Sequence, residues 1–168
     1  MRLTIRSGGQ TGVDRAALDA AIAAGLTYTG WCPNGGSAED FPEPPGLLTR
    51  YPALNETSSA DPAERTKDNV RDADATLILV ASDIAEESGT ELTRRTAERL
   101  GKPCLVVDLN AGDAVDQAQA WMQALSVRDG SLDLNVAGPR ESQSRGIYDS
   151  ARRFLSSLLR PRPDHEPR

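Results

Sequence analysis

Three glycine-containing turns carry the residues whose types and spacing best suit ligand chemistry. These turns are "SGGQTG" (7–12), "ESGT" (87–90) and "GPRESQSRG" (138–146). Glycine lets backbone N–H groups approach an anion, and a helix that follows adds free N–H groups and the positive end of its dipole. Arg140 or Arg145 could bind a phosphate through two parallel hydrogen bonds. Five hydroxyl groups are further candidate donors: Ser7, Thr11, Ser88, Thr90 and Ser142.

A single turn of this kind is more often structural than functional. "SGGQTG" matches neither GxGxxG nor the P-loop, and it has no lysine at the P-loop position. Thr11 and Asp14 have an alternative interpretation as the cap and the first-turn acid of a helix. Three comparable turns on one edge of a sheet nevertheless favour a site for a phosphate-bearing ligand.

The chain alternates strand-like and helix-like patterns, and this alternation must position the turns. Strands are expected over residues 3–6, 27–32, 75–81, 103–109 and 132–138, with a further short strand near 47–50. Helices are expected over 14–24, 62–73, 88–101, 114–125 and 146–159. This order predicts an α/β Rossmann-like three-layer fold with a mostly parallel sheet flanked by helices. We expect one ligand-binding domain over 1–160 and a disordered tail over 161–168.

Composition narrows the classes of protein and of partner. The chain has 168 residues and a formal net charge of −6, which disfavours binding to nucleic acid or to an anionic membrane surface. It contains no long apolar run and no secretory signal pattern, so we expect a cytoplasmic protein. His165 is the only histidine, which disfavours a His-based triad or metal site. Cys32 and Cys104 are expected to be buried, reduced thiols.

Other polar residues fit a ligand site less obviously. Glu39 and Asp40 follow the second expected strand, either on a solvated turn or as carboxylates that accept hydrogen bonds from an amino-substituted heterocycle. Arg65 and Asn69 share one helix face, which is usually solvated in so charged a helix. Asn135 lies within an apolar strand, so it is predicted to be buried and to need hydrogen-bond partners. It either orients the "GPRES" loop or bonds to neighbouring backbone groups.

Several segments, taken in order, resemble the molybdenum-cofactor carrier proteins. The most specific are "GGQTGVDRAALD" and "LNVAGPRES", and "GWCPNGGSAED", "ERTKDNVRDADATLIL", "SGTELT" and "KPCLVVDL" add to them. The resemblance runs from about residue 3 to about residue 158. That family belongs to a wider group of Rossmann-like nucleotide-binding proteins, which includes the cytokinin-activating phosphoribohydrolases. The chain departs from the family pattern in the proline-rich stretch after Asp40, and the role of residues 41–62 stays open.

The resemblance implies an oligomeric protein with a pocket for the molybdenum cofactor, a phosphorylated pterin that holds its metal through its own dithiolene. Molybdoenzymes would then be recipients of the cofactor. Carried over position by position, the residues expected to face the ligand are Gly8, Gly9, Gln10, Thr11, Gly12, Ser88, Gly89, Thr90, Asn135, Gly138, Arg140, Glu141 and Ser142. Asp14 joins this set either as a ligand contact or as a helix-start acid. Mg²⁺ is a further candidate, bridging Asp14 or Glu39 to the phosphate.

Three functions compete at this point. The first is a carrier that binds the cofactor and shields it, which fits the lack of a recognisable catalytic acid–base set. The second is a nucleotide hydrolase of the phosphoribohydrolase type, for which Asp14, Glu91 and Glu141 are the candidate carboxylates. The PGGxGTxxE signature of those enzymes is absent, and "SGTELT" keeps only its Gly-Thr core. The third is a sensor whose assembly responds to a bound nucleotide.

Overall fold

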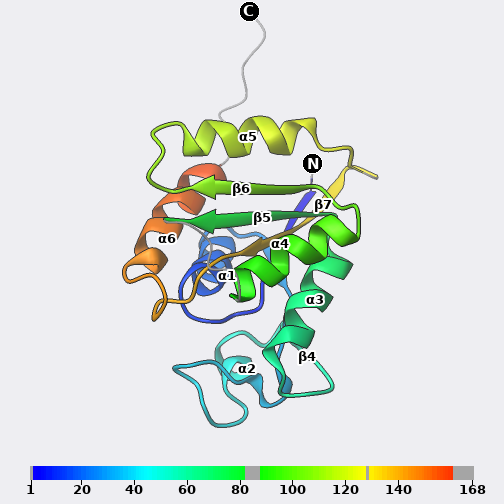
Figure 1. Ribbon diagram of the computed structural model, residues 1–168, viewed down its shortest axis with the longest axis vertical. Coiled ribbons are helices and arrows are strands. Elements are labelled where there is room, and N and C mark those ends of the chain that lie inside the picture. The colour runs from blue at the N-terminus through cyan, green and yellow to red at the C-terminus, as the bar shows by residue number, and fades with distance from the viewer. Residues whose placement is uncertain (1, 82–87, 128, 161–168) are drawn as a thin grey trace, which may run out of the picture.

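The strand order of the main sheet determines which loops can meet. We describe a computed structural model that covers residues 2–81, 88–127 and 129–160. Five parallel strands lie in the order β2-β1-β7-β5-β6. Their bounds are β1 Arg2–Arg6, β2 Thr27–Thr29, β5 Ala75–Val80, β6 Cys104–Asp108 and β7 Ser131–Ala137. Because β7 lies between β1 and β5, the carboxyl ends of these three strands are neighbours (Figure 1).

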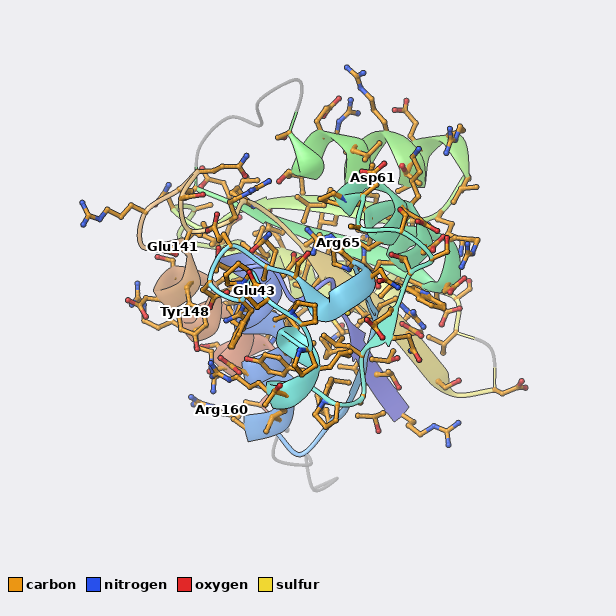
Figure 2. All side chains as sticks on the ribbon, turned by 90° about the horizontal axis from the view of Figure 1, so that it is seen from below. Glu43, Asp61, Arg65, Glu141, Tyr148 and Arg160 are labelled. Atoms are coloured by element: carbon orange, nitrogen blue, oxygen red, sulfur yellow. The ribbon has the colours of Figure 1, made fainter. Side chains whose placement is uncertain are left out.

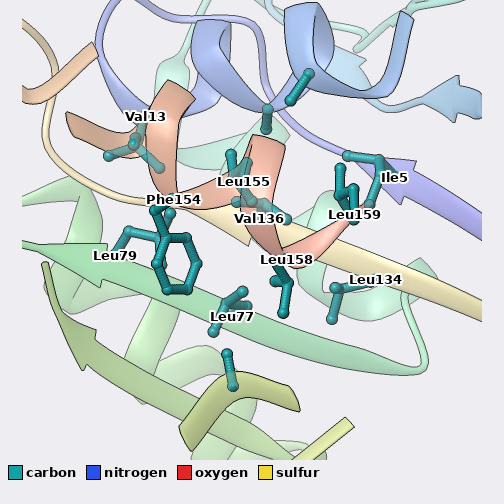
Figure 3. Close-up of a cluster of buried hydrophobic side chains, with 14 of the residues drawn as sticks. Ile5, Val13, Leu77, Leu79, Leu134, Val136, Phe154, Leu155, Leu158 and Leu159 are labelled. Carbon is teal, nitrogen blue, oxygen red and sulfur yellow. The ribbon is translucent and has the colours of Figure 1, made fainter. Parts of the chain in front are cut away.

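Helices cover both faces of the sheet, which confirms the predicted Rossmann-like three-layer fold. They are α1 Val13–Ala23, α3 Pro62–Asp72, α4 Gly89–Arg99, α5 Ala114–Ala124 and α6 Ile147–Leu158. The helices α3 and α4 pack together on one face, while α1, α5 and α6 lie on the other (Figure 1). Leu77 and Leu79 of β5 point into the core beneath α6, where they meet Phe154 and Leu155 (Figure 3). This apolar core supports the strand ends that carry the turns.

A small lobe, residues 31–56, extends from the main sheet. It contains β3 Trp31–Cys32, η1 Asn34–Gly36, α2 Leu47–Arg50 and β4 Asn55–Glu56, and its two strands pair in parallel. Leu47, Tyr51 and Cys32 are fully buried and pack against Leu18 of α1. Arg15 of α1 also places its guanidinium over the rings of Phe41 and Tyr51. The lobe therefore has its own apolar cluster, which attaches it to α1.

Two predicted strands are wrong in this region. The segment 27–32 is not one strand, because the chain turns at Gly30 with a φ of 149° and continues as β3 in a separate sheet. The segment 47–50 is the helix α2, closed by the hydrogen bond from the Tyr51 N–H to the Leu47 carbonyl at 2.8 Å. A helix here buries Leu47 while Arg50 stays exposed.

The two thiols differ in burial, contrary to the sequence prediction. Cys32 is buried, whereas Cys104 is only partly buried because it lies on β6, at the edge of the sheet. Both are free. His165 and the expected tail 161–168 lie outside the described residues. Within the described part of the chain, no helix has both the length and the apolar character needed to cross a membrane.

Gly12 allows the loop after β1 to touch the loop after β7. It has a φ of 81°, and a Cβ there would lie 2.3 Å from the Pro139 carbonyl oxygen. The neighbouring Val13 N–H donates to the same oxygen at 3.2 Å. Gly25 has a similar φ of 67°, but a Cβ there would have no neighbour within 4 Å. Both glycines therefore have a positive φ, but only Gly12 is also packed closely against another part of the backbone.

We expect Gly12→Ala to destabilise the fold more than Gly25→Ala. Gly25→Ala should cost about 1–2 kcal/mol in free energy of unfolding, from the left-handed backbone alone. Gly12→Ala adds an overpacking cost of about 1–3 kcal/mol, because the backbone of Pro139 cannot move away as a side chain could. Urea denaturation of both variants measures the difference. Equal losses for the two variants would contradict the close approach of the two loops.

Candidate ligand-binding site

The loop after β1, residues 7–12 (loop 1), accepts hydrogen bonds from side chains of two helices. The Gly8 carbonyl accepts a hydrogen bond from Arg65 Nη1 of α3 at 2.9 Å, and the Gly9 carbonyl accepts one from Arg15 Nε at 3.1 Å. Thr11 is not the cap of α1, because Gly12 occupies that position and makes no side-chain capping bond. Loop 1 therefore takes its shape from two buried arginines rather than from a local cap.

The loop after β7, residues 138–146 (loop 3), is tied to loop 1 through Thr11. The Thr11 hydroxyl accepts a hydrogen bond from the Glu141 N–H at 3.2 Å and itself donates to Glu39. The Glu141 carboxylate accepts hydrogen bonds from the N–H groups of Gly146 and of Tyr148, the latter at 3.1 Å. Glu141 therefore stabilises the start of α6, and Figure 2 shows it beside that helix near Tyr148.

The start of α4 supplies the third wall. Ser88 is the N-cap, and its hydroxyl accepts a hydrogen bond from the Glu91 N–H at 3.1 Å. Thr90 is 4% exposed and lies in the first turn. Glu87, which belongs to the predicted "ESGT" turn, lies outside the described residues. The first turn of α4 thus contributes N–H groups and a buried hydroxyl to the same end of the sheet.

The Glu91 carboxylate has strong partners of its own. It accepts hydrogen bonds from Arg94 at 2.7 and 2.8 Å and from Arg95 at 2.7 Å. These two guanidiniums, Arg94 first, lower the pKa of Glu91 to about 2. Glu91 is therefore ionised at neutral pH and carries no proton that it could donate to a leaving group.

The helix α3 brings two buried polar side chains to the site. Arg65 is 8% exposed and Asn69 is 3% exposed, so this face of α3 is not solvated. Besides its bond to Gly8, Arg65 places Nη1 3.6 Å from the Asp14 carboxylate. Asn69 donates to the Trp31 carbonyl and accepts from the Trp31 N–H, both at 2.9 Å. Asn69 thus fixes β3 to α3, while Arg65 connects α3 to loop 1 and to Asp14.

These elements enclose a small polar cavity, which we call the inner cavity, of about 50 Å³. It is lined by Gly8, Gln10, Asp14, Arg65, Thr66, Asn69, Gly89, Thr90, Thr93, Asn135, Ala137, Gly138, Arg140 and Gln143. Asn135 is 2% exposed and donates a hydrogen bond to the Thr76 hydroxyl at 3.4 Å, which confirms a buried polar group on β7. The described part of this lining contains two arginines and one carboxylate, so it is suited to an anion.

A wider cavity, the outer groove, adjoins the inner one between the first turns of α3 and α4. It has a volume of about 440 Å³ and shares Arg65, Thr66, Gly89 and Arg140 with the inner cavity. The rest of its lining includes the apolar side chains of Pro62, Ala63 and Leu92, together with Ser88, Glu91 and Arg95. A ligand could therefore place an anionic group inside and a larger ring system outside.

Asp14 is the carboxylate of the inner cavity. Desolvation by burial raises its pKa above the ordinary value, against the opposing effect of the Arg65 guanidinium. A Cβ at Gly8 would lie 2.9 Å from Asp14 Oδ2 and 2.7 Å from Arg65 Nη1. Only glycine at this position leaves room for the ion pair against the loop backbone.

Glu39 and Asp40, in the small lobe, already bond to donors from the protein. Asp40 accepts two hydrogen bonds from Arg15, at 2.7 and 2.8 Å, and these lower its pKa. Glu39 accepts one from the Ser142 hydroxyl at 2.8 Å and lies 3.9 Å from Arg140. Desolvation acts to raise the pKa of Glu39, but the bonds from Thr11 and Ser142 outweigh it and lower this pKa. Both carboxylates therefore brace the small lobe against α1 and the two loops.

The structure sorts the predicted site residues into distinct positions. Eight line the inner cavity: Gly8, Gln10, Asp14, Gly89, Thr90, Asn135, Gly138 and Arg140. Ser88 lines the outer groove, whereas Thr11, Gly12 and Glu141 line a different cavity between α1 and α6. Gly9 lies against Leu47 and Leu54, and Ser142 bonds to Glu39. Within the described residues, no group of three or more His, Cys, Asp or Glu side chains could hold a metal ion.

Six residues of the inner cavity were not predicted as site residues: Arg65, Thr66, Asn69, Thr93, Ala137 and Gln143. The four-residue spacing of Arg65 and Asn69 was the one available signal, since it places both on one face of a helix. Nothing in the spacing indicated that this face meets loop 1.

Comparison with known proteins identifies the family of the chain and a solved structure with the same fold. The family model described as the circularly permutated YpsA SLOG family matches residues 5–159. The chain is also similar to a protein from Syntrophus aciditrophicus SB whose crystal structure is named "putative molybdenum carrier protein". The two share 36% sequence identity over 93% of each chain, with a TM-score of 0.77. No curated protein matches the chain.

The ionised state of Glu91 can be tested by titration. In an NMR titration of side-chain carboxyl groups, we expect Glu91 to change protonation at about pH 2. Replacing both Arg94 and Arg95 with methionine should move this midpoint up toward about 4.3, the ordinary value for glutamate. A midpoint near neutral pH in the unmodified protein, as a general acid requires, would contradict the ion-pair assignment.

Proposed function

The chain belongs to the circularly permutated YpsA SLOG family, and we propose that it is a carrier that binds the molybdenum cofactor by its phosphate. The observation that carries the proposal is the pairing of a small cationic cavity with a wider groove. An inner cavity of about 50 Å³ has room for a single tetrahedral oxyanion and none for a pterin. The outer groove, at about 440 Å³, has the size of a site for a ring system.

In this proposal the phosphate lies between loop 1, the start of α4 and loop 3. Arg65 and Arg140 supply positive charge, and the first turn of α4 supplies N–H groups aligned with the helix dipole. The pterin rings lie in the outer groove against Pro62, Ala63 and Leu92. The cofactor holds its molybdenum through its own dithiolene, so the proposal requires no cysteine at the site.

The similarity to a protein named as a molybdenum carrier supports a carrier rather than a hydrolase. Glycosidic cleavage generally uses two carboxyl groups that flank the bond. Among the described residues, Asp14 is the one carboxylate of the inner cavity, Glu91 is bound by two arginines, and Glu141 is bound by the start of α6. The proposal includes molybdoenzymes as recipients, because a carrier must deliver its cofactor. It also includes the homo-oligomer that the family resemblance implies.

Cofactor content tests the proposal. Purified from a host that makes the cofactor, the full chain should carry pterin, measured by fluorescence after oxidation, and molybdenum, measured by mass spectrometry. Arg140→Ala should lower the bound pterin about tenfold or more, because a charge-assisted hydrogen bond contributes about 1.5–3 kcal/mol. Arg99→Ala is the matched control, since Arg99 is exposed at the far end of α4.

Two results would contradict the proposal. One is a wild-type protein that contains no pterin and takes up none when the cofactor is supplied. The other is an Arg140→Ala variant that retains as much pterin as Arg99→Ala does, because Arg140 would then make no contact with the cofactor.

A further inference from the structure

The inner cavity combines a carboxylate with the groups that would attract an anion. Asp14 is 9% exposed as a residue and lies between Arg65 and the backbone of Gly8. Burial raises the pKa of Asp14, while Arg65 and the backbone of Gln10 and Gly8 act to lower it. Besides pairing with Arg65, this negative charge repels an oxyanion, so it affects which anions can enter the cavity.

Within the described residues, the charged groups that face Asp14 are arginines. Arg65 of α3 is the nearest, at 3.6 Å, and Arg15 of α1 also acts on the carboxylate. Arg140 of loop 3 lines the same cavity. Arginine side chains keep their protons in proteins, so among these groups Asp14 and the anion itself are the ones that can exchange a proton. Burial of Asp14 makes it readier than an exposed aspartate to share such a proton.

An ionised carboxylate can accept a hydrogen bond but cannot donate one. A fully ionised oxyanion beside it would place two negative oxygens together in a desolvated cavity, where their repulsion is strong. An oxyanion that still carries a proton can instead donate this proton in a hydrogen bond to the carboxylate. Hydrogen phosphate carries such a proton at neutral pH, whereas sulfate and molybdate do not.

We infer that Asp14 is a specificity-determining residue, which makes the inner cavity select protonated oxyanions of the phosphate type over sulfate and free molybdate. The inference rests on the proposed function, which places a phosphate group in this cavity. It has a direct consequence for a molybdenum carrier. The cavity would reject molybdate, and it would take the cofactor's phosphate, a monoester whose last proton has a pKa of about 6, with that proton still bound or regained from the buffer.

Calorimetry with inorganic anions tests the inference on the full chain. At pH 8, inorganic phosphate is mainly the dianion that keeps one proton, so its binding should take up no proton from the buffer. Sulfate binding should take up one proton per site, and its affinity should fall about tenfold per pH unit above neutrality. At this pH we expect phosphate to bind at least about tenfold more tightly than sulfate or molybdate. Binding of those two anions requires a proton from the buffer, and pH 8 is one unit above neutrality, where this requirement costs about tenfold in affinity.

The variant Asp14→Asn removes the carboxylate and keeps its shape. Its amide can donate to any oxyanion, so the ratio of phosphate to sulfate affinity should fall to about one. Asp116→Asn is the matched control, because Asp116 is also a first-turn acid but lies exposed on α5. The control should keep the wild-type ratio, which separates the effect of Asp14 from the general effect of a helix-start charge.

The inference is overturned if the wild-type protein binds sulfate as tightly as phosphate at pH 8, or if it binds no anion. It is also overturned if folded Asp14→Asn keeps the wild-type preference. If that variant does not fold, the proton uptake of the wild-type protein is the test instead. Equal proton uptake on binding phosphate and on binding sulfate would contradict the inference. Loss of cofactor uptake with the phosphate preference intact would refute the carrier function alone.

Discussion

The guanidinium of Arg65 reaches from α3 to the Gly8 carbonyl and to the Asp14 carboxylate, and all three residues are buried. This contact links a helix on one face of the sheet to the start of a helix on the other face. Removing one member of a buried ion pair leaves an uncompensated charge, so replacing Arg65 or Asp14 alone costs stability. The walls of the inner cavity keep their spacing because this pair holds loop 1 against α3.

The rest of the site follows from chain topology. The last strand, β7, enters between β1 and β5, so three turns that are far apart in sequence become neighbours. Glycines at positions 12 and 138 then let loop 3 approach loop 1 and the end of β5. The small lobe adds Glu39 and Asp40, which bond to Ser142 and Arg15 and hold the outer side of the loops.

The alternation of strands and helices and the three glycine turns could be predicted from the sequence, because both have strong local patterns. The small lobe could not, since Gly30 breaks an apparently continuous strand and Leu47 is buried by a partner on α1. The role of Arg65 was equally hidden, because a helix rich in Arg, Lys and Asp has the pattern of a solvated one. Its partner Gly8 lies 57 residues away in the chain.

The central claim is that the three turns form one oxyanion site around Asp14 and Arg65. A crystal structure of the full chain grown with saturating inorganic phosphate tests this claim most directly. We expect one phosphate in the inner cavity, within hydrogen-bond reach of Asp14, Arg140 and the first turn of α4. An inner cavity that holds only water under these conditions, with phosphate bound elsewhere on the protein, would contradict the account.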